Sequence, residues 1–368
     1  MTRKNTGTWY ILFILTASCL LLRELRPVAC YDLISGPLAP CTERFCQPPA
    51  CRCPSPNPPN NLNPSAVPQM VIVSFDLAVT AYVASFFEQL FPIDIINPNG
   101  CPIAATFFVP DQERTDYNAV RQLYARGHEI ASNSQSRRQP PLWWNSASYL
   151  DYVYEIYGQR INLETGTDIP EGKITGMRVP YLQPGGNNMY RMLRDYNFTY
   201  DSSMVTGPTS AHNYAVFPPF YPFTLDIPPN NTLCDIYPSN CPNASYPGLW
   251  EIPINRMYGT DGQGCAMMDD CKVTTSDDTF NVLLAQFFSE YYNRKRAPYG
   301  LYFQGKWLEN NQAFDGLKRF IRYINKMDDV FFVTSSQVIE WMKQPTPLSQ
   351  INSFAPWRSN SGLCGEKK

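Results

Sequence analysis

The chain alternates between two kinds of apolar pattern along most of its length. Short runs rich in Val, Ile and Phe have the length and composition of buried strands. Longer segments between them carry apolar residues three and four positions apart, as amphipathic helices do. The expected strands lie at 70–75, 104–109, 128–132, 174–179, 200–204, 249–254 and 300–305, and the expected helices at 82–91, 118–127, 150–161, 187–196, 279–294 and 313–326. Residues 329–342 complete the series with one more strand and one more helix.

Strands that alternate with helices predict an α/β fold with a largely parallel sheet and helices outside it. The number of units favours a closed or nearly closed (β/α) barrel over an open sheet. In such folds, reactive groups lie where strands end and loops begin.

One long segment, at about 208–271, interrupts the alternation. It is rich in Pro, Asn and Tyr, and only the strand-like run "LWEIPI" breaks it. Its four cysteines form two closely spaced pairs, Cys234 with Cys241 and Cys265 with Cys271. This spacing favours local disulfides in a long insertion, although sequence alone does not determine the connectivity.

The N-terminal region has the organisation of a secretory leader. Arg3 and Lys4 precede an apolar run at 9–22 that is short for a membrane span. We therefore expect a signal peptide at 1–29, cleaved near Ala29, rather than an uncleaved anchor.

Three further regions follow the leader. Residues 30–69 form a cysteine-rich segment and a Pro/Asn-rich linker, and we expect disulfides to attach this segment to another part of the chain. A folded domain is expected at 70–347 and a C-terminal tail at 348–368.

Composition limits the compartments and the binding partners that we expect for this protein. The net charge is −2 and no basic block is present, so nucleic acid is not an expected partner. Twelve cysteines in a chain that opens with a leader-like segment indicate an oxidising compartment. We therefore expect a secreted, extracellular protein with no membrane span after cleavage. Asn197, Asn230 and Asn243 begin N-glycosylation sequons, which also arise by chance.

Polar residues follow the ends of several expected strands. They are Asp76, Asn133, Arg137, Arg178, Tyr181, Asp201 and Gln304. Leu77 is apolar where a metal site would require a second ligand beside Asp76. The chain holds only 2 His, His128 and His212, which are too few for a histidine-based zinc site.

Seven segments give the chain a resemblance to a known family. They are "CQPPACRC", "NPNGCPIAATFFV", "GHEIA", "MRVPYLQPGGNN", "YDSSM", "RAPYGLYF" and "VFFVTSSQVIEWM", between Cys46 and Met342. The chain resembles animal chitin deacetylases, which are NodB-type polysaccharide deacetylases. This resemblance implies a distorted (β/α) barrel carrying the long insertion.

The resemblance also implies roles for individual residues. The family holds a zinc ion with one Asp and two His and leaves one position open for water. Asp76 corresponds to the general base, Arg178 to the arginine that orients it, and Tyr181 to the backbone N–H that stabilises the oxyanion.

The remaining family positions carry different residues. The metal positions are occupied by Leu77, Asn133 and Arg137, and the general acid His is replaced by Gln304. Leu has no lone pair, the Asn carbonyl is a poor zinc ligand, and Arg cannot be deprotonated to bind a cation. We therefore expect that the zinc cofactor has been lost.

Two hypotheses describe what replaces the metal. In the first, Arg137 occupies the vacated position and pairs with Asp76; in the alternative, Arg137 points to solvent beside Arg138. For Asp76 and Arg178, the alternative to a ligand-binding role is a structural one. They would form a buried ion pair that is retained because losing one partner would leave the other unpaired.

Three functions are compatible with this sequence. The first is binding of chitin or a related N-acetylglucosamine-containing glycan in extracellular matrix, without catalysis. Its expected site comprises Asp76, Asn133, Arg137, Arg178, Pro180, Tyr181, Asp201, Trp250, Gln304 and Trp307, and Trp143 and Trp144 also lie near strand ends. Sugar rings stack on such aromatic faces, but core packing is the alternative for each ring. The second function is a structural role with other matrix proteins as partners, and the third is weak hydrolysis by Asp76 alone.

Overall fold

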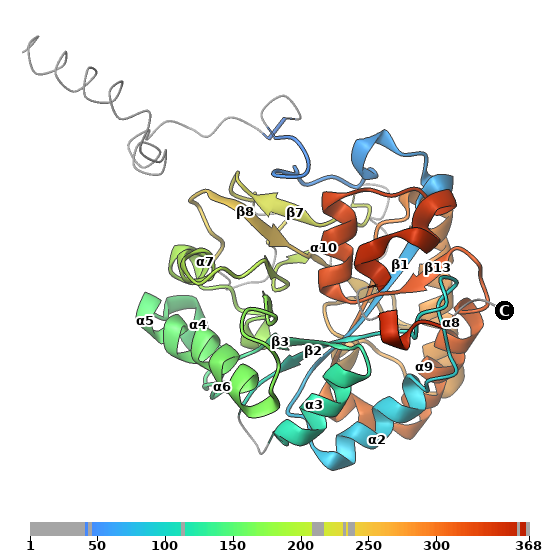
Figure 1. The fold of residues 1–368 in the computed structure, drawn as a ribbon, viewed down its shortest axis with the longest axis horizontal. Coiled ribbons are helices and arrows are strands. Elements are labelled where there is room, and N and C mark those ends of the chain that lie inside the picture. The colour runs from blue at the N-terminus through green and yellow to red at the C-terminus, as the bar shows by residue number, and fades with distance from the viewer. Residues whose placement is uncertain are drawn as a thin grey trace, which may run out of the picture. The chain divides into compact units, whose positions relative to one another are not determined.

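The computed structural model describes residues 41–42, 46–111, 115–207, 217–230, 233–234, 240–358 and 361–365 (Figure 1). A curled sheet forms its centre, and helices surround the sheet on the outside. The predicted signal peptide and His212 lie outside the described residues.

The main sheet contains nine strands. They are β1 (Gln69–Asp76), β2 (Thr106–Val109), β3 (Glu129–Ser132), β4 (Gly176–Met177), β5 (Tyr200–Asp201), β7 (Phe223–Leu225), β8 (Tyr246–Glu251), β12 (Tyr299–Gln304) and β13 (Val330–Phe332). Their order is β12-β1-β2-β3-β4-β5-β8-β7, and β13 pairs with the start of β1. All neighbours are parallel except β7 and β8. The predicted barrel class is confirmed. The barrel is a curled half-barrel rather than a closed one, because no pairing among the described residues joins β7 to β12.

The insertion is more regular than the sequence predicted. It supplies β7, the antiparallel edge strand, in addition to the expected strand β8. It also forms a small hairpin of β10 (Met257–Tyr258) and β11 (Gly264–Cys265) and contributes β9 (Ile254–Asn255), which pairs with β6 (Val205–Thr206). Both predicted local disulfides are confirmed, Cys234–Cys241 and Cys265–Cys271.

Helices connect the parallel strands. They are α2 (Ala81–Leu90), α3 (Tyr117–Ala125), α4 (Trp143–Ser146), α5 (Tyr149–Tyr152), α6 (Gly158–Thr167), α7 (Gly186–Asp195), α8 (Ser276–Gln286), α9 (Asn311–Ile324) and α10 (Ser335–Lys343). Hydrogen bonds from side chains explain several helix starts. Thr334 and Gln337, for example, form a reciprocal capping box at α10.

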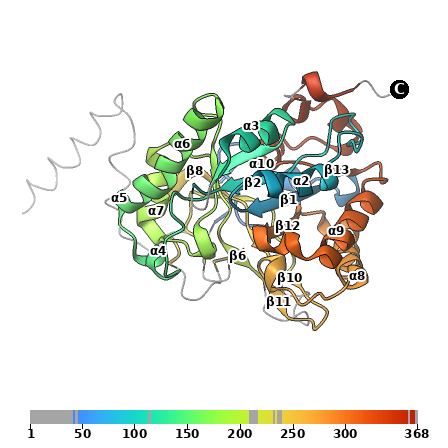
Figure 2. The ribbon, with the colours of Figure 1, turned by 90° about the horizontal axis from the view of Figure 1, so that it is seen from below.

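The core contains two hydrophobic clusters. The larger is centred on a layer of aromatic rings across three adjacent strands, in which Phe75 of β1 stacks on Phe107 of β2 at 5.4 Å and on Phe303 of β12 at 5.3 Å. The smaller lies under α4, α5 and α7, which are grouped together at one end of the molecule in Figure 2. Because side chains alternate along a strand, Ser74 and Asp76 point to the face opposite Phe75. That face carries the candidate site.

The cysteine-rich segment protects the edge of the sheet. Its disulfides, Cys41–Cys53 and Cys46–Cys51, are internal, so the expected covalent attachment to another part of the chain was wrong. Hydrogen bonds make the attachment instead: Thr224 N of β7 donates to Arg52 O at 2.9 Å, and Tyr221 N donates to Ser55 O at 3.0 Å. These bonds satisfy the outer edge of the last strand.

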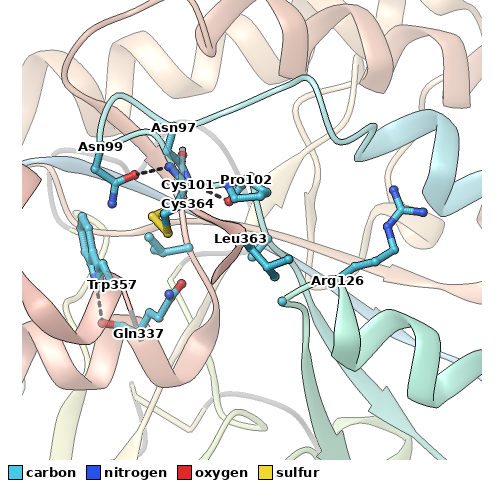
Figure 3. Close-up of a pocket in the computed structure, with 12 residues that line it drawn as sticks. Asn97, Asn99, Cys101, Pro102, Arg126, Gln337, Trp357, Leu363 and Cys364 are labelled. Carbon is cyan, nitrogen blue, oxygen red and sulfur yellow. Dashed lines mark hydrogen bonds between the residues drawn. A yellow bond between two sulfur atoms is a disulfide. The ribbon is translucent and has the colours of Figure 1, made fainter. Parts of the chain in front are cut away.

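A long-range disulfide, Cys101–Cys364, joins the C-terminal region to the loop before β2. Both cysteines line a cavity of about 30 Å³ together with Asn99, Gln337 and Trp357 (Figure 3). A cavity of this size has room for a single water molecule. Within the described residues, no helix combines the length and apolar character needed to cross a membrane.

Candidate functional site

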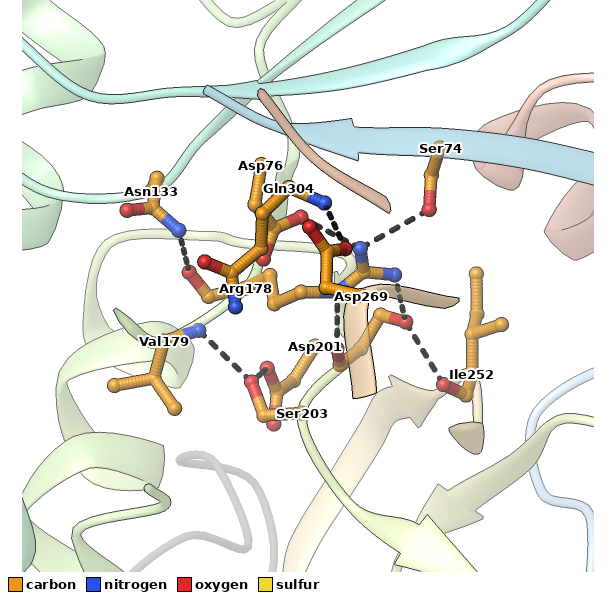
Figure 4. Close-up of polar contacts among 11 residues, drawn as sticks. Ser74, Asp76, Asn133, Arg178, Val179, Asp201, Ser203, Ile252, Asp269 and Gln304 are labelled. Carbon is orange, nitrogen blue, oxygen red and sulfur yellow. Dashed lines mark hydrogen bonds and ion pairs between the residues drawn. The ribbon is translucent and has the colours of Figure 1, made fainter. Parts of the chain in front are cut away.

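Arg178 is the centre of the polar network at the strand ends (Figure 4). Its backbone N–H extends the ladder beyond β4 by donating to Ser132 O at 3.1 Å, which directs the side chain into the half-barrel. The guanidinium donates to Asp76 Oδ1 at 2.7 Å, to Ser74 Oγ at 3.0 Å and to Ser202 through both Nε and Nη2. The side chain is 0% exposed.

Aromatic rings enclose the same guanidinium. Its central carbon lies 4.0 Å from the ring centroid of Phe108 and 5.1 Å from that of Tyr302. Ring faces stabilise a cation that has been removed from water. Asp76 is 4% exposed, so the two charges form a buried, hydrogen-bonded ion pair. The predicted pairing of Asp76 with Arg178 is therefore present.

The side chains at the family metal positions do not converge on an ion. Leu77 is 4% exposed and belongs to the larger hydrophobic cluster. Asn133 is fully buried and donates its amide to Arg178 O at 3.0 Å. Its Oδ1 has no hydrogen-bond partner among the described residues.

Arg137 does not pair with Asp76. Its backbone turns into the left-handed region at φ 44°, and its N–H donates to Ser134 Oγ at 2.9 Å. The guanidinium lies 5.5 Å from the ring centroid of Tyr181, whose hydroxyl donates to Arg137 O at 2.9 Å. No ion pair to Arg137 is present in the described part of the chain, so the charge-replacement hypothesis was wrong. The tight turn after Ser134 explains the difference, because it directs the side chain toward Tyr181.

Asp269 is a site residue that sequence reasoning missed. It comes from the insertion, in a 3₁₀ turn at Met268–Asp270, and its Oδ2 accepts from Gln304 N at 2.7 Å. Burial, with smaller contributions from the charges of Asp270 and Asp76, raises the pKa of Asp269 to about 6, although the hydrogen bond from the Gln304 N–H opposes this shift. The only sequence signal was the acidic pair between two cysteines.

A second missed residue is Glu251, at the end of β8. Glu251 and Asp201 are directly paired between β8 and β5, and both are fully buried. Asp201 accepts from Tyr190 at 2.7 Å and from Ser203 at 2.5 Å, while Glu251 Oε1 accepts from Met204 N at 3.0 Å.

The two buried carboxyl groups influence each other's protonation. Burial raises the pKa of both, and burial together with the charge of Asp201 raises that of Glu251 well above its ordinary value. The folded protein therefore favours the protonated form of Glu251. Asp201 was predicted as a glycan contact, but its bonds are internal.

Two predicted aromatic contacts are core residues. Trp250 is 2% exposed and Trp307 is 6% exposed, with its ring 4.5 Å from that of Phe303. Neither offers a ring face to a sugar, because each ring fills the space between the sheet and the layer outside it. Pro180 is also buried, and Trp144 is fully buried. The half-buried residues at this end include Gln304, Arg137, Tyr181, Trp143 and Asp269.

Two curated proteins of Bombyx mori are similar to this chain over most of its length. Chitin deacetylase 8 is 35% identical over 320 residues, which is 85% of this chain and 81% of that protein. The chain belongs to the chitin deacetylase family. Chitin deacetylase 1 is 33% identical over 339 residues, and this chain spans only 61% of its length. No family model matches the chain.

A solved structure of similar fold comes from a Mycobacterium smegmatis protein assigned as a polysaccharide deacetylase. It superposes with a TM-score of 0.53 at 17% identity, over 77% of this chain and 93% of that protein. This similarity identifies the fold alone. The predicted fold class is therefore confirmed for this member of the chitin deacetylase family.

The residues of this family member do not fit the zinc ion that the resemblance implies. Leu77 offers no donor atom, Asn133 offers only a neutral amide oxygen, and Arg137 is a cation. Within the described residues, one group of three His, Cys, Asp or Glu side chains is close enough to share an ion: Cys41, Cys46 and Cys53. Their sulfurs are bonded in disulfides and cannot act as thiolate ligands.

Proposed function

We propose that this chain is a secreted, non-catalytic member of the chitin deacetylase family that binds chitin or a related N-acetylglucosamine-containing glycan in extracellular matrix. The observation that carries the non-catalytic part is the side chain at each metal position: a buried hydrocarbon, a buried amide bonded to Arg178, and an arginine stacked on Tyr181. A deacetylase of this type uses the ion to polarise the acetyl carbonyl and to activate water. None of these three side chains supplies either effect.

The vestigial general base has no ion beside it to supply a reactive water. A base must reach the water whose proton it removes, within about 3 Å or through one further water. Asp76 keeps the arginine partner that the family uses to orient its base, at 2.7 Å, but it is nearly sealed from solvent and its neighbour Leu77 offers no metal ligand. The same contacts stabilise the fold, so their retention has a structural reason without catalysis.

Glycan binding rests on family membership and on the partly exposed residues at the strand ends. Tyr181 and Trp143 are half-buried and each lies beside an arginine, Arg137 at 5.5 Å and Arg138 at 4.5 Å. Aromatic rings and guanidinium groups together provide apolar faces and hydrogen-bond donors for a sugar. The relatives' names as chitin deacetylases favour chitin as the first polymer to test.

The test is a pull-down on crystalline chitin with wild type, two site variants and one control variant. Wild type should bind, and Tyr181→Ala and Trp143→Ala should each bind at least several-fold more weakly. Tyr323→Ala provides a matched control, because Tyr323 is an exposed tyrosine on α9. Wild-type protein that stays in the supernatant would contradict glycan binding.

A second candidate function is favoured by the burial of Trp250 and Trp307. If the strand ends bind no sugar, the fold serves as a structural matrix protein that engages other proteins. The same pull-down separates the two functions, since a structural protein would ignore chitin in all four forms.

A further inference from the structure

The turn that follows α7 places an asparagine in an unusual backbone conformation. Asn197 has φ 55°, in the left-handed region. The N–H of Phe198 donates to Leu193 O at 2.9 Å, and the N–H of Asn197 donates to Arg194 O at 3.1 Å. This pair of bonds ends a helix with a left-handed residue, a position where Gly and Asn are favoured. The turn alone would therefore accept either residue.

Asparagine at this position also begins the sequon Asn197-Phe198-Thr199. The neighbours of Asn197 are anchored, since Phe198 is 5% exposed and Thr199 N donates to Thr175 O at 2.7 Å. Asn197 itself is exposed, and its side chain makes no hydrogen bond to the described part of the chain. By contrast, the Asn243 side chain accepts from Asn187 Nδ2 at 2.5 Å.

An aromatic pair lies beside the same turn. The ring of Tyr196 lies 4.1 Å from that of Tyr157, and both side chains are half-buried. Tyr196 immediately precedes Asn197 in the chain. Aromatic surface of this kind is where the first sugar of an attached glycan gains contact.

We propose that Asn197 is an N-glycosylation site of this protein. This inference depends on the secretory route in the proposed function, but not on glycan binding at the strand ends. The donor is a lipid-linked oligosaccharide diphosphate in the secretory lumen. A bond forms between Asn197 Nδ2 and C1 of the first sugar, and the C1–O bond to the diphosphate breaks. The lipid diphosphate leaves with the bonding electrons, and the amide proton passes to solvent.

The glycan has a structural consequence at this turn. Residues 196–199 connect α7 to β5, the strand that carries the buried Asp201. A sugar in contact with Tyr196 restricts the turn in the folded protein only. Its removal should therefore lower the melting temperature without changing the fold.

The experiment uses the full chain expressed in insect cells, with the medium and the cell fraction collected separately. Treatment with the amidase that releases N-glycans converts the carrier Asn to Asp, and peptide mass spectrometry reads this conversion at residue 197. Wild type should be converted there, and Thr199→Ser, which keeps the sequon, should behave as wild type. Asn197→Gly and Thr199→Ala should lose one glycan in mass.

Asn197→Gly separates the modification from the turn. Gly accepts the left-handed conformation more readily than Asn, so the turn is preserved while the acceptor is lost. A lower melting temperature for Asn197→Gly than for glycosylated wild type supports the inference. Secreted protein without conversion at residue 197 would overturn the site while leaving secretion intact. Retention of the protein in the cytosol would overturn both.

Discussion

Arg178 Nη1 lies 2.7 Å from Asp76 Oδ1, and this ion pair is sealed between two aromatic rings at the ends of the central strands. In an active deacetylase of this family the equivalent carboxylate would act on water beside a metal. Here the carboxylate keeps its guanidinium partner, but the neighbouring metal position is the hydrocarbon side chain of Leu77. The pair holds β1, β4 and the loop after β5 together.

Breaking this pair should destabilise the protein strongly. Asp76→Ala or Arg178→Ala leaves an uncompensated buried charge, and each should cost about 3 to 5 kcal/mol in free energy of unfolding. The double variant should cost clearly less than the sum of the two, because neither charge is then left unpaired. Urea denaturation of the four proteins measures the coupling.

Arg137 provides a matched control for the double-mutant cycle of Asp76 and Arg178. Its guanidinium contacts Tyr181 and makes no ion pair with Asp76. Arg137→Ala and Asp76→Ala should therefore be additive within about 0.5 kcal/mol. Coupling of the Arg137 and Asp76 substitutions as large as that of Asp76 and Arg178 would mean that Arg137 does reach the vacated metal position.

Acid should destabilise the protein through His128. Its Nδ1 accepts from Ala105 N at 3.1 Å, and burial, followed by the Arg126 charge, lowers its pKa from 6.5 to about 3. Between pH 6.5 and pH 3, His128 therefore binds a proton in the unfolded chain but not in the folded chain. Stability falls as pH decreases through this range. From pH 7 to pH 4.5 this should remove about 2 kcal/mol.

His128→Asn tests that contribution. The Asn side chain offers an acceptor to Ala105 N but does not titrate, so this variant should be less stable at pH 7 and lose less stability on acidification. Chemical denaturation at the two pH values measures the difference. Equal acid losses in the two proteins would show that His128 becomes protonated without unfolding.

Glu251 should have the opposite effect, so that stability falls as pH rises. Because its folded pKa is raised, the folded state retains a proton that the unfolded chain loses above about 4.5, and stability declines as pH rises toward the folded pKa. Glu251→Gln keeps the shape of the side chain but does not titrate, so its stability should decline less between pH 5 and pH 9. Glu309→Gln, at an exposed position, should decline as wild type does. If the stability of Glu251→Gln declined with pH as steeply as that of wild type, a group other than Glu251 would have to hold the proton.

The disulfides should contribute unequally. Cys101–Cys364 closes a loop with a sequence separation of 263, whereas the separation for Cys265–Cys271 is 6. Loop-closure entropy predicts about 5 kcal/mol for the first and about 2 kcal/mol for the second. Paired Cys→Ser variants compared by thermal unfolding measure both values. A larger loss from the short loop would indicate that native-state packing outweighs chain entropy.

Sequence pattern predicted the strands and helices because the pattern is local. Each expected strand overlaps a strand of the structure, since a buried apolar run can be recognised from five or six consecutive residues. β7 was missed because Phe223–Leu225 is only 3 residues long in a Pro-rich segment, and its pairing with β8 depends on tertiary context.

The site was predicted less completely, because its geometry depends on residues far apart in sequence. The family resemblance implied the Asp76 and Arg178 pairing, but the direction of Arg137 depends on a left-handed turn with no clear sequence signal. Asp269 reaches Gln304 from the insertion, and Trp250 and Trp307 are buried by layers that no local pattern describes.

Acetate release from N-acetylated chito-oligosaccharides, assayed with and without added zinc or cobalt, tests the central claim most directly. Wild type should stay at background in every condition, because Leu77, Asn133 and Arg137 supply no metal ligands. Metal-stimulated acetate release that disappears in Asp76→Asn would contradict the account and show that the chain is an active deacetylase.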